Sequence, residues 1–157
     1  MKVSVVIPAY NAQKTIAETV EQSIAQAKGP IEVEVVVVDD GSDDNTATIA
    51  ESAGATVIRQ ENTGPATARN QGWMSATGQV ICFTDSDCVP IAGWLENLLD
   101  GFSDGKVGAV AGSYEIANNS SWLAQWVHQE IIERHKRMPA FAWNEKSRVS
   151  PGSRFSM

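Results

Sequence analysis

Short apolar runs alternate with amphipathic stretches along the first 111 residues. One run, 33–38, is β-branched at nearly every position and lacks alternation, which is typical of a strand covered on both faces. Strands are predicted at 3–7, 33–38, 55–59, 80–83 and 107–111. Helical spacing of apolar residues between them predicts an α/β fold with a mostly parallel, Rossmann-like sheet flanked by helices.

Start and stop signals place the predicted helices between these strands. Asn11 is expected to cap the first helix, which would end near Gly29, and Pro65 is expected to open the third. Gly54 is expected to end the second helix, and Ile91 to begin the apolar stripe of the fourth. A last helix is predicted within 121–138.

Composition narrows the classes of function. A chain of 157 residues has the usual size of one domain, and its net charge of −7 argues against nucleic acid as a partner. Two cysteines are too few for a disulfide framework, so we expect a reducing, cytoplasmic compartment and a buried, unreactive Cys82. The sequence has neither a signal-peptide pattern nor an apolar run long enough to span a membrane.

Three of the predicted strands end in polar segments: Pro8 to Asn11, Asp39-Asp40-Gly41-Ser42 and Asp85-Ser86-Asp87. The carboxyl ends of parallel strands line one crevice, where ligands bind. Asp85 and Asp87 can converge there on one hard cation, although acidic triplets also occur in solvated turns. The motifs G-x-G-x-x-G and G-x-x-x-x-G-K-[ST] are missing, which counts against dinucleotide-binding and P-loop proteins.

Four segments resemble, in order, the signatures of family 2 inverting glycosyltransferases, which have the GT-A fold. They are VVIPAYN (5–11), VVDDGS (37–42), GPATARNQG (64–72) and FTDSD (83–87). The resemblance implies a donor region over 1–113 and the start of an acceptor region over 114–157. It also implies sugar transfer with inversion, in cell-envelope polysaccharide synthesis, from a nucleoside-diphosphate sugar, usually UDP-linked, to a saccharide or lipid-linked acceptor.

The resemblance assigns roles residue by residue. Pro8, Ala9 and Tyr10 would surround the nucleoside, and Asp40 would accept a hydrogen bond from the base. Asp85, beside the ribose or a metal-bound water, and Asp87, on the diphosphate, would hold Mn²⁺ or Mg²⁺. Further donor-binding candidates are Asn11, Asp39, Arg69, Asn70 and Ser86. For two of them an alternative stays open: Asp39 would bond only backbone, and Arg69 would pair with a surface carboxylate.

The end of the chain departs from the family pattern. Inverting transfer needs a base for the acceptor hydroxyl, and the family supplies it from a later motif near Gly-Gly-Phe-Asp that has no match here. After Trp143 the single acidic residue is Glu145. We therefore expect the catalytic base to lie beyond Met157, in a longer chain.

Two other functions remain open. The chain could be a non-catalytic module that binds a nucleotide sugar. It could also be a nucleotidyltransferase, which shares the fold class but usually carries a glycine-rich loop with a basic residue where this chain has Pro8 to Asn11.

The last 30 residues hold six of the twelve Lys and Arg side chains but only three of the nineteen Asp and Glu. One interpretation is a solvated helix face followed by a tail. The other is a peripheral, salt-sensitive contact of residues 121–154 with anionic lipid at the inner face of the membrane.

The missing base leads to a first prediction. The 157-residue chain should bind donor without transferring sugar, because loss of a general base typically costs about 10² to 10⁴ in rate. Calorimetry with UDP and a transfer assay measure the two properties on one sample. Efficient transfer to an acceptor would place the base within this chain, with Glu115, Glu130 and Glu145 the first candidates.

Overall fold

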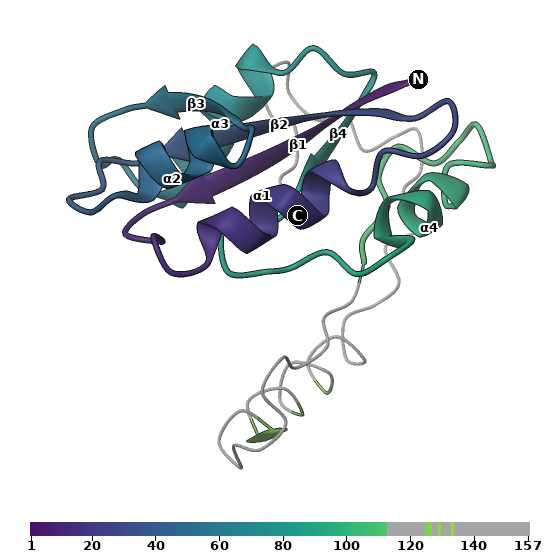
Figure 1. Ribbon diagram of the computed structural model, residues 1–157. Coiled ribbons are helices and arrows are strands. Elements are labelled where there is room, and N and C mark those ends of the chain that lie inside the picture. Colours follow the sequence, from purple (N-terminus) through teal and green to yellow (C-terminus); the bar gives the residue numbers. More distant parts are fainter. Residues whose placement is uncertain (113–124, 127–128, 130–132, 134–157) are drawn as a thin grey trace. The chain divides into compact units, whose positions relative to one another are not determined.

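The structure, a computed structural model, describes residues 1–112, 125, 126, 129 and 133 (Figure 1). Its elements, in order, are β1 (Lys2–Ala9), α1 (Ile16–Ile24), β2 (Glu32–Asp39), α2 (Thr46–Ser52), β3 (Thr56–Arg59), α3 (Pro65–Ser75), β4 (Val80–Phe83) and α4 (Trp94–Asp100). The chain divides into two compact units, with 1–97 in the first and the described residues from 98 onward in the second. The predicted division at residue 113 stays a prediction.

All strands of the sheet are parallel, in the order β3-β2-β1-β4. Helices α1 and α2 lie side by side over one face, and α3 lies against β1 and β2 on the other (Figure 1). Residues 35–38 of β2 are buried without alternation because both faces of the strand are covered. The predicted α/β fold is confirmed, and the carboxyl ends of β1, β2 and β4 meet at one edge.

Strand β1 continues through Pro8, although it was expected to end at Ile7. On the β4 side, the Val6 carbonyl accepts a hydrogen bond from Thr84 N. On the β2 side, the Ala9 carbonyl accepts a hydrogen bond from Asp40 N. Backbone groups alternate along a strand, so the Pro8 nitrogen points to the β4 side, beyond the last paired residue of β4. A proline is tolerated there because no ladder hydrogen bond is lost.

Helix α3 packs closely on the sheet through small residues. Ala68 is fully buried in a cluster with Val6 and Val38. A methyl group on Gly72 would lie 2.3 Å from Val6 Cγ1, so a glycine is needed at this closest approach. In β4, burial raises the pKa of the Cys82 thiol to about 11, which confirms that Cys82 is an inert, buried residue.

The expected helix cap at Asn11 is wrong. Helix α1 begins five residues later, at Ile16, and ends at Ile24 rather than near Gly29. Asn11 instead has a positive φ of 50°, and its side-chain oxygen accepts a hydrogen bond from Asp43 N. Asparagine tolerates this backbone conformation, so the residue forms a turn that is bonded to the loop after β2.

Two expectations near the end of the described chain are also wrong. Helix α4 begins at Trp94, and Ile91 lies before it with 65% of its surface exposed. Residues 107–111 form no strand, and no strand neighbour for them occurs within the described part of the chain. Their composition suits a strand, but an unpaired run cannot form a ladder, and Val107 N instead closes a turn onto Asp104 O.

The predicted last helix lies mostly outside the described residues. Gln125, Trp126, Gln129 and Glu133 are helical, and Trp126 is exposed. None of the described helices is long and apolar enough to cross a bilayer. The lipid contact proposed for 121–154 therefore stays a prediction.

Glu34 joins three segments at the amino-terminal end of the sheet. Its carboxylate pairs with Lys2 and accepts hydrogen bonds from Ser4 Oγ, Thr77 N and Thr77 Oγ1 at 2.5 to 2.7 Å. Burial acts to raise the pKa of Glu34, but Lys2 and these donors outweigh it and lower the pKa from 4.5 to about 2. The carboxylate therefore stabilises the folded chain while it is ionised.

Glu34→Gln should lower the melting temperature at neutral pH, because the neutral amide loses the ion pair. Because the pKa of Glu34 is lower in the folded chain than in the unfolded chain, its carboxylate stabilises the fold fully above about pH 4.5. This stabilisation is lost as the pH falls towards about 2. The difference between wild type and variant should therefore shrink across that window in thermal melts. Exposed Glu32→Gln, in the same strand, is the control, and a difference that persists undiminished at the acid end would contradict the assignment.

Candidate functional site

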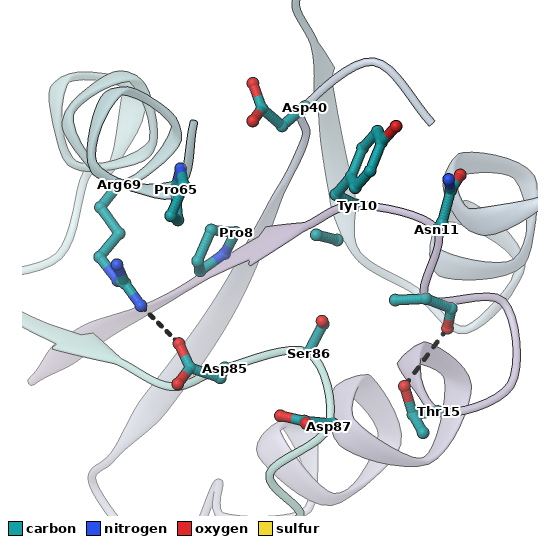
Figure 2. Close-up of a pocket in the computed structure, with 12 residues that line it drawn as sticks. Pro8, Tyr10, Asn11, Thr15, Asp40, Pro65, Arg69, Asp85, Ser86 and Asp87 are labelled. Carbon is teal, nitrogen blue, oxygen red and sulfur yellow. Dashed lines mark hydrogen bonds and ion pairs between the residues drawn. The ribbon is translucent and has the colours of Figure 1, made fainter. Parts of the chain in front are cut away.

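An open cleft of about 410 Å³ lies at the carboxyl ends of β1, β2 and β4 (Figure 2). Its lining residues are Pro8, Ala9, Tyr10, Asn11, Ala12, Thr15, Asp40, Pro65, Arg69, Asp85, Ser86 and Asp87. All come from the first compact unit. The three polar strand ends identified in the sequence thus meet around one cavity, as parallel pairing requires.

Two predicted site residues do not line the cleft. Asp39 is buried, and its Oδ1 accepts a hydrogen bond from Ser42 N at 3.1 Å. This contact matches the alternative in which Asp39 only bonds backbone. Asn70 lies exposed on α3, one residue past Arg69, and is not among the lining residues.

Tyr10 stands at the rim of the cleft. It follows the last residue of β1, and half of its surface is exposed. Figure 2 shows its ring between Asp40 and Asn11, on the opposite side of the cavity from the acidic turn, Asp85-Ser86-Asp87. An exposed aromatic ring in this position offers a flat apolar face to a ligand.

Asp40 is buried and heavily hydrogen-bonded. Its Oδ1 accepts from Gln60 Nε2 at 2.7 Å and Thr63 N at 2.9 Å, and its Oδ2 accepts from Gly64 N at 2.9 Å. Burial acts to raise the pKa of the carboxyl, but these donors outweigh it and hold the pKa below its ordinary value. The donors from Gln60, Thr63 and Gly64 therefore tie Asp40 to the loop before α3 and fix that loop.

Arg69 and Asp85 form an ion pair inside the cleft. Arg69 Nη2 lies 2.5 Å from Asp85 Oδ1, and their side chains are 23% and 48% exposed (Figure 2). Arg69 therefore pairs with a carboxylate, as in one of its two alternatives, but this carboxylate belongs to the site itself. The contact of Arg69 with phosphate stays a prediction. The pair offsets negative charge where Asp85 and Asp87 lie close in sequence.

Asp85 and Asp87 are suitable ligands for a hard cation. Mg²⁺ and Mn²⁺ are held by oxygen atoms, and Mg²⁺ commonly uses one or two carboxylates together with substrate phosphates. The described residues contain no group of three or more acidic, histidine or cysteine side chains that could hold a metal without such a substrate. The donor set therefore fits a cation that binds together with a phosphorylated ligand.

Sequence reasoning missed three lining residues, Ala12, Thr15 and Pro65. Pro65 lies in the segment 64–72 that carried the resemblance, which also holds the predicted site residues Arg69 and Asn70. Ala12 and Thr15 reach the cleft because the turn at Asn11 delays the start of α1, and the Thr15 hydroxyl donates to the Ala12 carbonyl. No local signal marks either residue, since their place depends on that turn.

Comparisons with known proteins agree with this geometry. A family model described as Glycosyl transferase family 2 matches residues 4–156. The Escherichia coli protein UDP-Glc:alpha-D-GlcNAc-diphosphoundecaprenol beta-1,3-glucosyltransferase WfgD is 32% identical over 138 residues, which are 85% of this chain and 54% of that protein. This chain thus spans about half the length of WfgD.

Two solved structures are similar in fold. S. aureus TarS in complex with UDP-GlcNAc has a TM-score of 0.59 and 34% identity, over 66% of this chain and 32% of that chain. Mannosyltransferase PcManGT from Pyrobaculum calidifontis, in complex with GDP-Man and Mn²⁺, has a TM-score of 0.61 and 31% identity, over 68% of this chain and 33% of that chain. The shared part in each case is about a third of the solved chain.

Asp40→Ala should loosen the loop that precedes α3, because Thr63 N and Gly64 N lose their acceptor. We expect faster amide hydrogen exchange at these two residues and weaker ligand binding, with or without metal. Asp43→Ala, an exposed change in the loop after β2, is the matched control. Unchanged protection of Thr63 and Gly64 in the Asp40 variant would show that the loop is held by other contacts.

Proposed function

The chain belongs to glycosyltransferase family 2, and from this premise we propose that its cleft binds the nucleoside-diphosphate sugar donor of an inverting glycosyltransferase. One observation carries the proposal: Tyr10, Asp40, Arg69, Asp85 and Asp87 converge on a single open cleft at the carboxyl ends of three parallel strands. Family membership removes the nucleotidyltransferase alternative. A non-catalytic binding module remains as an outcome of experiment.

UDP is the nucleotide that we propose. TarS is described in complex with UDP-GlcNAc, and the name of WfgD specifies UDP-Glc, whereas PcManGT is described with GDP-Man. The base would stack on the ring of Tyr10 and donate a hydrogen bond to the carboxylate of Asp40. A uracil ring offers an N–H that can donate this hydrogen bond.

The diphosphate would lie between Arg69 and the acidic turn. Arg69 is held by Asp85 in the structure, so binding of a phosphate would exchange one anionic partner for another. Asp87, with Asp85, would hold Mn²⁺ or Mg²⁺. When bound, the cation would offset the negative charge that develops on the leaving nucleoside diphosphate.

Transfer also needs an acceptor and a base. By analogy with the name of WfgD, which specifies a sugar on a lipid diphosphate, we propose a saccharide or lipid-linked acceptor hydroxyl. The acidic residues of the cleft are all assigned to the donor, so the base is expected from another part of the whole protein. A cytoplasmic location at the inner face of the membrane would suit such an acceptor.

Calorimetric titration with UDP, in the presence and absence of Mn²⁺, tests the donor site. Mn²⁺ should strengthen UDP binding in the wild type, and Asp87→Ala should abolish this gain while leaving metal-free binding nearly unchanged. Glu18→Ala removes one exposed carboxylate outside the cleft and should behave like the wild type. A Mn²⁺ gain that survives in the Asp87 variant would refute the metal assignment, and no binding of UDP at all would refute the proposed function.

A further inference from the structure

The acidic turn has little secondary structure of its own to hold it. Strand β4 ends at Phe83 and α4 begins at Trp94, so Asp85 to Asp87 belong to the connection between them. Within this connection Thr84 N donates to Val6 O, and Cys88 N closes a turn onto Asp85 O. The position of the two carboxylates therefore depends on what else contacts this segment.

Two buried polar side chains make that contact, one from helix α1 and one from the turn that follows it. The Thr19 hydroxyl lies 3.1 Å from the Ser86 carbonyl oxygen, and Thr19 is fully buried. Further along, Gln26 Nε2 donates to Ile91 O at 3.1 Å, and its Oε1 accepts from Leu95 N at 3.3 Å. Helix α1 and the turn after it thus contact the connection twice, inside the acidic turn and again where it leads into α4.

The hydroxyl proton of Thr19 has two acceptors within reach, Ser86 O at 3.1 Å and Thr15 O at 3.3 Å. The Thr15 carbonyl already accepts the helical hydrogen bond from Thr19 N. Donation to Ser86 is the shorter contact and satisfies a second carbonyl. A partly buried carbonyl without a donor carries a cost, so the hydroxyl is well placed to hold Ser86 in this orientation.

The Ser86 carbonyl belongs to the peptide bond that leads into Asp87, so its orientation determines how Asp87 projects beside Asp85. Asp85 has a second restraint in its ion pair with Arg69. Asp87 is exposed, and its carboxylate accepts a long hydrogen bond of 3.8 Å from Cys88 Sγ, which is a weak donor. The position of Asp87 therefore depends mainly on the backbone that Thr19 holds.

We propose that Thr19 is a positioning residue for the divalent cation: its hydroxyl holds the Ser86 peptide so that Asp85 and Asp87 are presented together to a cation on the donor diphosphate. This inference rests on the proposed function. It adds that a residue of α1, outside the four motifs and outside the cleft lining, sets the affinity of the metal without touching the ligand.

Thr19→Val tests the proposal, because valine has nearly the same shape and lacks the hydroxyl. Loss of one hydrogen bond of ordinary strength should weaken Mn²⁺ binding in the presence of saturating UDP by about three- to tenfold. UDP affinity without metal should stay within about twofold of wild type, since the base and Arg69 contacts do not depend on Ser86. Electron paramagnetic resonance of free Mn²⁺ measures the first quantity, and calorimetry measures the second.

Two variants separate positioning from general packing. Thr19→Ser keeps the hydroxyl and should retain wild-type Mn²⁺ affinity, even if the lost methyl group lowers stability. Ser23→Ala removes another fully buried hydroxyl of α1, which donates at 2.7 Å to Thr19 O and does not reach the acidic turn. Its Mn²⁺ affinity should also match the wild type, whatever happens to its melting temperature.

The outcomes distinguish the inference from the proposed function. If the wild type binds UDP and Mn²⁺ and Thr19→Val binds Mn²⁺ equally well, the inference is wrong and the donor site stands. An equal loss of Mn²⁺ affinity in Ser23→Ala or Thr19→Ser would also overturn it, because the effect would then be one of packing. If the wild type binds no UDP, the proposed function fails and the inference with it. If Thr19→Val does not fold, the Mn²⁺ affinity of Thr19→Ala is compared with that of the wild type instead.

Discussion

Parallel pairing of β1 with β2 on one side and β4 on the other is the constraint on which the rest of the structure depends. It brings the carboxyl ends of three strands to one edge of the sheet, although their residues are far apart along the chain. The sheet can take this form because helices cover both of its faces and because Gly72 lets α3 approach closely. The cleft is a direct consequence of that pairing.

The site collects negative charge, and the structure offsets it in two different ways. Asp40 is buried among hydrogen-bond donors from the loop before α3, which favour its ionised form and fix its position. Asp85 is paired with Arg69, whereas Asp87 is left exposed. One carboxylate therefore serves to build the cavity, one is held by a positive partner, and one is available to a cation. This division of roles fits a donor site of glycosyltransferase family 2.

Buried and partly buried polar side chains do much of the positioning. Glu34 ties β1 and β2 to the segment before β4 at the amino-terminal end of the sheet, while Thr19 of α1 and Gln26, in the turn after α1, hold the connection after β4. Each makes hydrogen bonds where burial would otherwise carry a penalty, so each also specifies one arrangement of the segments it joins. The acidic turn is held from both the sheet and α1.

Residue pattern and motif predict the order of strands and helices along the chain, the three polar strand ends and most of the cleft lining. These features depend on near neighbours in sequence and on the geometry of parallel sheets. Residue pattern does not predict the turn at Asn11, the exposure of Ile91 or the lack of a strand at 107–111. Each of these depends on whether a distant segment supplies a partner. The same holds for the hydrogen bond of Thr19 to Ser86, which joins residues 67 positions apart. Local sequence specifies which elements form and which chemistry they carry. Contacts across the folded chain specify where each side chain is held, because a hydrogen bond between distant residues leaves no periodic signal in either segment.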